Sequence, residues 1–314
     1  MKKRKSLFKW IGGKKWLQKD LQTIFSRKIN NPDIDTYIEP FCGGLGSILS
    51  NLDFLKDNGI KKIIANDINS GLIGLYKNIQ NNPKELIDVY HKIELRYSKK
   101  IPKKAESLNP TKDKEEIRPL LSNAQKYYAK CKDDFNNIKE KKSTSVECSA
   151  LFLFLMNHCF NGVYRENLSG KFNTPYNWEC KIIKTEETEE NILFHSKIFN
   201  EIEFVFTNMG AIEFISAHMS SSKNAFFYFD PPYLNDKKKI ENKYNKNGFN
   251  YSDQISTLNT LLKLDNFVYS NHNLDVFIEF VQHNKLESKT VYRSNVMNSL
   301  SENRGKKVAE IIIY

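Results

Sequence analysis

Short apolar runs alternate with stretches of helical periodicity, mainly in residues 1–80 and 191–314. Runs rich in aromatic or β-branched residues predict buried strands, and apolar positions spaced by three or four residues predict helices. The predicted strands span residues 35–41, 61–65, 203–207, 225–229, 266–270, 289–292 and 308–313. The predicted helices beside them span residues 48–56, 72–97, 211–218, 253–264 and 274–283. This alternation predicts an α/β fold built on one sheet.

Residues 81–190 interrupt the alternation between the second and third predicted strands. Helical periodicity returns at 120–135, and the apolar stretch 150–160 is typical of a buried helix. The lysine-rich stretch 98–118 has little core potential and is expected to form a loop or insertion. We therefore expect a discontinuous catalytic domain, made of the two flanking parts of the chain, that carries a largely helical insertion.

The composition favours a cytosolic protein with a polyanionic partner. No apolar run approaches the ~20 residues that a membrane helix needs, and the basic start, Met1–Lys5, does not lead into an apolar signal core. The formal net charge of +11 points to nucleic acid, although a merely solubilising lysine-rich surface would look the same. Five cysteines without a CxxC pair and six scattered histidines predict neither a disulfide framework nor a metal site.

The segment Asp230-Pro231-Pro232-Tyr233 is the first candidate for chemistry. It follows a predicted strand, and two prolines in a row can continue neither a strand nor a helix. Asp230 is therefore expected at the carboxyl end of a strand, where ligands bind in open α/β sheets. A carboxylate, a rigid carbonyl at Pro231 and the ring of Tyr233 suit a planar ring that bears an exocyclic amino group. Taken alone, the segment fits a turn in which Asp230 caps local backbone equally well.

A second candidate lies where the first two predicted strands end. Strand 35–41 runs into the glycine turn 42–47 and then into a helix, an arrangement that lets a ligand approach the backbone. Asp67 follows the second strand, where nucleotide-binding folds place an acid that accepts hydrogen bonds from a ribose. Nicotinamide dinucleotides and S-adenosylmethionine both carry such a ribose, and a plain turn with a helix cap would give the same pattern.

Two further stretches predict contacts with nucleic acid. Residues 160–176 hold amides, an arginine and aromatics between Asn-Gly and Ser-Gly turns, and these groups read base edges or wedge into a base stack. An ordinary hairpin connection would look similar. Lys237, Lys238 and Lys239 lie in the predicted loop 234–250 and are expected to contact phosphates without reading sequence.

Taken in chain order, the motifs resemble those of the Dam-like (D12 class, alpha-type) N6-adenine DNA methyltransferases over nearly the whole chain. The segments that carry the resemblance are Phe8–Lys14, Glu39–Ser47, Asn66–Asn69, Phe160–Tyr176, Asp230–Tyr233, Ser270–His272 and Arg304–Lys307. The glycine turn is one residue longer than the family's usual pattern, which leaves open whether Gly43, Gly44 or Gly46 lies closest to a ligand. The stretch 98–118 has no counterpart that can be aligned.

The resemblance implies a Rossmann-like S-adenosylmethionine-dependent methyltransferase sheet whose insertion, residues 81–190, recognises the target in double-stranded DNA. It implies methyl transfer to a flipped-out adenine without a metal. The implied cofactor contacts are Trp10, Lys14, Phe41, Gly43, Asp67 and Asp230. The implied catalytic residues are Asp230, Pro231 and Tyr233. The implied DNA contacts are Lys9, Phe160, Asn161, Arg165 and Asn167. A GATC site, a monomeric state and a cognate restriction endonuclease are further expectations.

Several alternatives remain at this point. A nicotinamide oxidoreductase shares the glycine turn and Asp67 but has no use for the segment that begins at Asp230. An RNA base methyltransferase shares the fold and that segment, but it is not expected to carry the long insertion. An N4-cytosine methyltransferase would use the same chemistry, more often with serine at the position of Asp230. A non-catalytic DNA-binding protein would bind the cofactor or DNA and transfer no methyl group.

Overall fold

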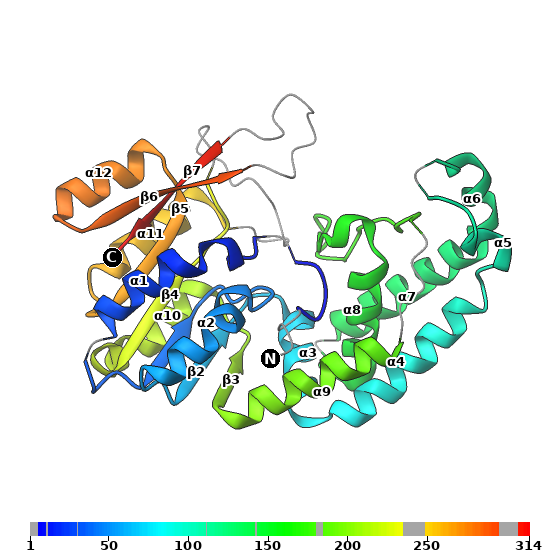
Figure 1. Ribbon diagram of the computed structural model, residues 1–314, viewed down its shortest axis with the longest axis horizontal. Helices are drawn as coiled ribbons and strands as arrows, with labels where there is room; N and C mark the ends of the chain where they lie inside the picture. The colour runs from blue at the N-terminus through cyan, green and yellow to red at the C-terminus, as the bar shows by residue number, and fades with distance from the viewer. Residues whose placement is uncertain are drawn as a thin grey trace.

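The computed structural model describes residues 6–10, 12–29, 31–110, 112–141, 143–179, 185–234, 249–294 and 307–314. Within these residues, seven strands form one sheet in the order β3-β2-β1-β4-β5-β7-β6 (Figure 1). The strands are β1 (Thr36–Glu39), β2 (Lys62–Asn66), β3 (Glu203–Thr207), β4 (Ala225–Phe229), β5 (Phe267–His272), β6 (Ser288–Ser294) and β7 (Lys307–Ile313). Strands β1 to β5 pair in parallel, and β7 lies antiparallel between β5 and β6. The α/β fold predicted from the sequence is confirmed.

The direction in which the sheet grows reverses between β1 and β4. From β1 the chain builds outward through β2 and β3, and it then returns to place Ala225 of β4 beside Thr36 of β1. Strand β5 continues outward from β4. In open α/β sheets, ligands bind beyond the carboxyl ends of the strands at such a reversal. The turn after β1 and the segment after β4 are therefore neighbours at the edge where a ligand is expected.

Helices cover both faces of the sheet. Successive residues of a strand point to opposite faces, so an apolar strand places apolar side chains on both of them. On β4, Phe226 and Tyr228 belong to one apolar cluster, whereas Phe227 and Phe229 belong to the other. The first cluster takes in residues of α1 (Gln18–Lys28), α2 (Gly46–Asp57) and α3 (Ser70–Asn81). The second takes in residues of α10 (Ala211–His218), α11 (Tyr251–Leu261) and α12 (Asp275–Asn284). Burial on both faces explains why β4 is apolar throughout.

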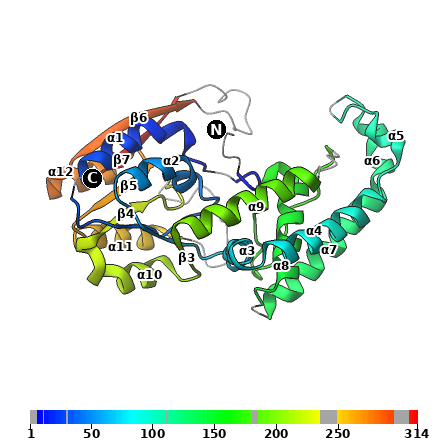
Figure 2. The same ribbon diagram turned by 60° about the horizontal axis from the view of Figure 1, so that its bottom comes forward.

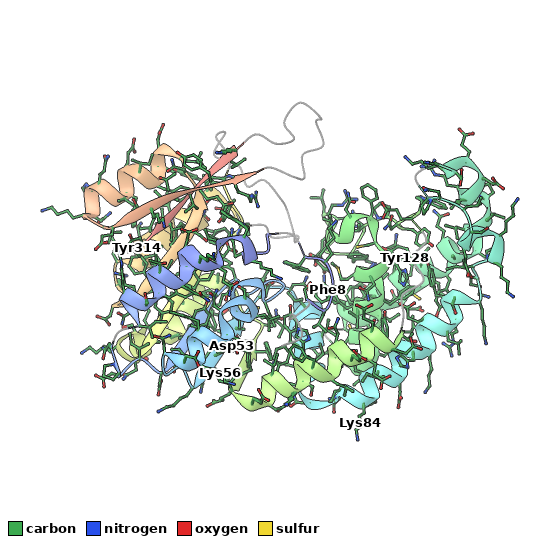
Figure 3. All side chains as sticks on the ribbon, in the orientation of Figure 1. Phe8, Asp53, Lys56, Lys84, Tyr128 and Tyr314 are labelled. Atoms are coloured by element: carbon green, nitrogen blue, oxygen red, sulfur yellow. The ribbon has the colours of Figure 1, made fainter. Side chains whose placement is uncertain are left out.

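Between β2 and β3 the chain forms a helical lobe that extends to one side of the sheet (Figures 1 and 2). Its helices are α4 (Pro83–Ser98), α5 (Lys103–Glu106), α6 (Lys114–Leu120), α7 (Ser122–Glu140), α8 (Val146–His158) and α9 (Thr185–Glu201). The first apolar cluster continues from the sheet into this lobe, where Phe8 packs against Phe152 and Tyr128 lies further inside the lobe. Lys84 of α4 points outward (Figure 3). The domain boundaries near residues 81 and 190 stay a prediction.

Several helices differ from the sequence prediction. The stretch 72–97 forms two helices, because Pro83 has no amide hydrogen to donate and suits the first position of α4. The stretch 98–118 is not a simple loop, since α5 and α6 each bury one apolar side chain, Ala105 and Ile117. Helices α1 and α9 were not predicted; both are polar on average, so packing rather than a strong apolar pattern fixes them.

Two sequence predictions lie outside the described residues: the cluster Lys237, Lys238 and Lys239, and the greater part of the segment Arg304–Lys307. Strand β5 extends to His272, so that Asn271 and His272 form its end rather than following it. Among the helices that the structure describes, none has the length and apolar character to cross a membrane.

Candidate active site

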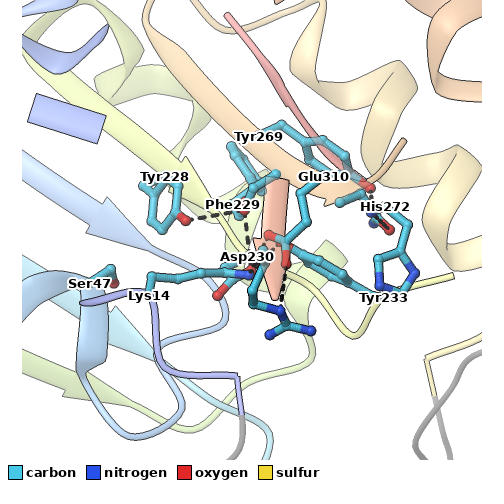
Figure 4. A network of polar contacts seen from close by, with 12 residues as sticks. Lys14, Ser47, Tyr228, Phe229, Asp230, Tyr233, Tyr269, His272 and Glu310 are labelled. Atoms are coloured by element: carbon cyan, nitrogen blue, oxygen red, sulfur yellow. Dashed lines mark hydrogen bonds and ion pairs between the residues drawn. The ribbon is translucent and has the colours of Figure 1, made fainter. Parts of the chain in front are cut away.

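Asp230 stands at the carboxyl end of β4, as the sequence predicted, with the buried Pro231 directly after it. Its Oδ1 atom lies 3.0 Å from Nζ of Lys14 and accepts a hydrogen bond of 3.2 Å from the Ser270 hydroxyl (Figure 4). Its Oδ2 atom has no hydrogen-bond partner among the described residues, and 16% of the side chain is exposed. One carboxylate oxygen is thus fixed, and the other is left to accept from a ligand.

A network of charged groups surrounds Asp230 (Figure 4). The buried ammonium of Lys14 donates to the hydroxyl of Tyr233 and lies 3.4 Å from Oε2 of Glu310. The Tyr233 hydroxyl in turn donates to Glu310 at 2.9 Å. Arg293 of β6 reaches the other oxygen of Glu310, with its Nε atom 3.5 Å away. Two cations and two carboxylates therefore meet at the end of the sheet.

Burial and these charges set the protonation of the site. Burial raises the pKa of Asp230, the Lys14 ammonium lowers it in part, and the negative charge of Glu310 raises it again. Burial and the charge of Asp230 also raise the pKa of Tyr233 well above its usual range. The phenol therefore keeps its proton at neutral pH and acts as a hydrogen-bond donor.

The end of β5 holds the segment that follows Asp230. The Ser270 hydroxyl lies between the Asp230 carboxylate and the Phe229 carbonyl. Asn271 accepts a hydrogen bond from the Leu234 amide at 3.2 Å, and Nδ1 of His272 lies 2.7 Å from the Leu234 carbonyl. The His272 ring also meets the Tyr233 ring edge-on, with centroids 4.8 Å apart. The family-like segment Ser270–His272 thus fixes the geometry of the residues around Asp230.

The glycine turn and Asp67 lie on the β1 side of the reversal. The Asp67 carboxylate accepts from the amide of Gly43 at 3.0 Å and from the amide of Asn69 at 2.8 Å. Burial raises the pKa of Asp67 to about 6, and the two amide hydrogen bonds limit the rise. The Tyr76 hydroxyl donates to the Gly43 carbonyl at 2.7 Å. Gly43 is thus held from both of its peptide groups, in a backbone conformation with a φ of +43°.

Trp10 packs against the glycine turn. A β-carbon on Gly43 would lie 2.8 Å from the indole Nε1, and one on Gly44 would lie 2.7 Å from the Trp10 side chain, so both positions need glycine. On its other side the indole stacks on Tyr164, with centroids 6.2 Å apart and an interplanar angle of 27°. Phe41, the next aromatic of this region, is half-buried and meets Phe249 edge-on. Trp10, Gly43 and Asp67 are brought together, and Phe41 lies on the opposite face of the sheet.

The predicted nucleic-acid contacts of residues 160–167 are all exposed. Phe160, with 51% of its surface exposed, and Asn161, with a φ of +57°, begin a hairpin that is closed by antiparallel bridges from Cys159 to Tyr176 and from Glu166 to Phe172. Arg165 donates to the Asn173 side chain at 2.9 Å. Asn167 accepts from the amides of Ser169 and Lys171 and so shapes the tip of the hairpin.

Helix α7 and the N-terminal segment hold this hairpin in place. The Asn136 side chain accepts from the amide of Phe172 at 2.8 Å and donates to its carbonyl at 3.1 Å, as a neighbouring strand would. Lys139 binds Tyr164 and the Glu166 carboxylate. Lys9 is exposed and packs on Gly162, where a β-carbon would come within 2.8 Å of the lysine side chain. The predicted DNA contacts therefore lie on a hairpin that is held by α7 and packs beside Trp10.

Sequence reasoning missed Glu310, Arg293, Asn136 and Lys139. Glu310 carried a signal, because it is a lone acid in the apolar strand β7, where an unpaired charge would be costly. The other three are ordinary polar residues on amphipathic elements. Only the packing of distant segments reveals them.

The fold and the site together define an α/β methyltransferase class, with a glycine turn after β1, an acid after β2 and Asp-Pro-Pro-Tyr after β4. The chain belongs to the family of D12 class N6 adenine-specific DNA methyltransferases, whose pattern matches residues 10–296. It is 30% identical to the type II methyltransferase M.MjaIII of Methanocaldococcus jannaschii, over 98% of each chain. It is 26% identical to the type II methyltransferase M1.LlaDCHI of Lactococcus lactis subsp. cremoris, over 97% of this chain and 93% of the relative. The DNA adenine methylase of Escherichia coli (strain K12) is 27% identical, over 99% of this chain and 95% of its own length.

Proposed function

We propose that this protein transfers a methyl group from S-adenosylmethionine to the N6 atom of adenine at a defined site in double-stranded DNA. The observation that carries the proposal is the Asp230 carboxylate. One of its oxygens is held by Lys14 and Ser270, and the other has no partner in the described part of the chain. Family membership supplies the reaction class, and the relatives named DNA adenine methylase support adenine as the base.

The β1 side of the reversal fits the cofactor. Asp67 offers its carboxylate to a ribose, the glycines of the turn present backbone without side chains, and Trp10, backed by Tyr164, lies against that turn. When bound, S-adenosylmethionine supplies an electrophilic methyl group on a positively charged sulfur. Lys14 is a proposed contact of the cofactor, but its ammonium is also engaged by Asp230 and Tyr233. We therefore place Lys14 between the cofactor side and the target side of the site.

The β4 side suits the target base. The adenine amino group is a poor nucleophile because its lone pair is delocalised into the ring. Asp230 and the Pro231 carbonyl accept hydrogen bonds from its two N–H groups. These bonds direct the lone pair towards the methyl group and stabilise the positive charge that develops on nitrogen. As the N–C bond forms and the S–C bond breaks, the extra proton on nitrogen is lost to solvent through Asp230. Tyr233 stacks on the base.

The hairpin is the proposed DNA contact. The amino group of a paired adenine cannot reach Asp230, so the nucleotide is flipped out of the duplex. Phe160 and Asn161 are exposed beside the site and fill or hold open the gap, while Arg165 reads a base edge and Lys9 and Asn167 bind the backbone. GATC is the recognition site that we propose. A monomer acting in the bacterial cytoplasm, paired with a restriction endonuclease as the type II names of two relatives suggest, completes the proposal.

Long-read sequencing of DNA from a methylation-free host that expresses the chain tests base and site together. We expect N6-methyladenine at one short sequence. In vitro, tritium should pass from labelled S-adenosylmethionine to duplex DNA. Asp230→Ala should abolish this transfer, whereas Glu213→Ala, a change at an exposed residue, should leave it intact. Methylated cytosine, label in RNA alone, or binding without transfer would each replace the proposal by one of its rivals.

A further inference from the structure

A fully buried carboxylate lies at the candidate site without a part in the chemistry proposed above. Glu310 sits on β7, in register with His272 of β5 and Val291 of β6, and its exposed fraction is 0%. An unpaired carboxylate at such a position would be strongly destabilising. An apolar residue would pack there at no such cost, as Ile311 to Ile313 do in the same strand. The acid therefore calls for a reason connected with its contacts.

Those contacts all lead to the catalytic segment. Oε2 of Glu310 accepts from the Tyr233 hydroxyl at 2.9 Å and lies 3.4 Å from Nζ of Lys14. The same ammonium donates to the Tyr233 hydroxyl and lies 3.0 Å from Asp230. Lys14 is therefore shared between two carboxylates. The Tyr233 hydroxyl lies between Lys14, from which it accepts a hydrogen bond, and Glu310, to which it donates one (Figure 4). Oε1 faces Arg293, so that the charge of Glu310 is also balanced from β6.

Sharing changes what Asp230 can do. Without Glu310, the charge of Lys14 would be balanced by Asp230 alone, and a tight ion pair would weaken the carboxylate as an acceptor. We propose that Glu310 is a positioning residue for methyl transfer, which fixes the Tyr233 ring through its hydroxyl and holds Lys14 so that Asp230 keeps one oxygen for the adenine amino group. This inference rests on the proposed function and adds a residue to its site.

The electrostatics around Glu310 give the proposal a distinctive readout. The groups that face it are Lys14, Arg293, Tyr233, His272 and, through Lys14, Asp230. Its negative charge is one of the causes that raise the pKa of Asp230. Removing the charge therefore lowers that pKa. Because Asp230 must be ionised to accept a proton, the acid limb of the rate profile moves to lower pH.

The test is single-turnover methylation of a duplex by the full chain across a range of pH. Glu310→Gln keeps the shape of the side chain and removes its charge. We expect it to slow transfer by about 10- to 100-fold, as small displacements of catalytic groups do, and to move the acid limb to lower pH. The affinity for DNA should not change. Glu310→Asp keeps the charge and should retain the original limb with part of the lost rate restored.

The exposed Glu287, directly before β6, provides a matched control, since Glu287→Gln removes the same charge at a residue that pairs with Arg27 and not with the network. A general loss of folded protein would lower the rate of Glu310→Gln without moving its acid limb, and that result would overturn the proposal. An unchanged rate and limb in Glu310→Gln, with an active wild type, would do the same. A wild type that methylates no adenine would instead overturn the proposed function.

A second pair of variants serves if Glu310→Gln does not fold. Tyr233→Phe removes the hydroxyl that Glu310 holds and keeps the ring. Residues that act as one unit show non-additive losses. The double variant Tyr233→Phe with Glu310→Asp should therefore be about as slow as the slower single variant. Losses that multiply would show that Glu310 does not act through the Tyr233 hydroxyl.

Discussion

At the scale of single residues, the proposed contact of Asp67 with a ribose would link cofactor binding to pH. Its pKa is raised to about 6, mainly by burial. In the proposed contact, ribose hydroxyls donate to the ionised carboxylate, so that below this pH binding would require Asp67 to lose its proton first. The affinity for S-adenosylmethionine should therefore be constant above pH 7 and fall by about tenfold for each pH unit well below 6. Calorimetric titration at several pH values measures this.

Asp67→Asn is the matched variant, because the amide cannot titrate and keeps an acceptor oxygen. Its affinity should be lower at pH 7.5 and nearly independent of pH down to 5. A wild-type affinity that stays flat between pH 5 and 7.5 would show that Asp67 does not bind the ribose.

The sequence predicted the residues that follow parallel strands better than those within the last strands. Asp67 and Asp230 were found because β2 and β4 are short apolar runs with an acid directly after them, and the carboxyl ends of parallel strands share one edge. Glu310 reaches the same edge only because β7 runs antiparallel between β5 and β6. The residues of β7 alone do not predict the direction of the strand or the strands with which it pairs.

At the scale of elements, α7 supports the hairpin. Asn136→Ala would leave both the amide and the carbonyl of Phe172 without their partner in a buried place. We expect a loss of about 1–3 kcal/mol in the free energy of unfolding, with faster amide exchange in the hairpin and weaker DNA binding. S-adenosylmethionine affinity should be retained. Urea unfolding with hydrogen exchange tests this, and the exposed neighbour Asn137→Ala is the control.

The hairpin itself should read sequence through Arg165. A guanidinium that bonds a guanine edge with two hydrogen bonds discriminates by about 1–3 kcal/mol against the wrong base. Arg165→Ala should therefore slow methylation of the preferred site far more than that of sites altered at one base pair. Arg165→Lys keeps the charge and should restore affinity without restoring discrimination. Single-turnover rates on a panel of duplexes decide this, and equal losses on every duplex would place Arg165 on a phosphate.

Some turns followed from local chemistry, whereas the contacts between elements did not. The Asn-Gly and Ser-Gly turns of the hairpin were visible in the sequence, but the start of α4 at Pro83 was missed, because helical periodicity runs on through the break. The hydrogen bonds from Asn136 and Lys139 to the hairpin depend on how α7 packs. In the sequence, such an asparagine cannot be told from one on an exposed helix face.

At the scale of the whole molecule, the charge of +11 should matter only on the surface that is proposed to contact DNA. Lys9 is exposed beside the hairpin. Lys62 begins β2, at the amino ends of the parallel strands and so away from the candidate site, and pairs with Glu203. Lys9→Gln should weaken binding to all sequences and reduce the salt dependence, log K against log salt, by about one unit. Lys62→Gln should change neither. Equal effects of the two changes would contradict this placement of the DNA.

The pairing of β1 with β4 has a consequence for how the chain reaches its native state. More than half of the chain lies between these strands. Joining such distant segments is entropically costly and slow. The helical lobe lies within that interval, and its contacts, such as α7 with α8 and α4 with α8, join segments that are closer in the sequence than β1 and β4 are. It can form early and bring β2 and β3, which lead into and out of it, side by side. During refolding, helical ellipticity should therefore recover before cofactor binding, and the lobe that carries the proposed DNA contacts would also guide assembly of the catalytic sheet.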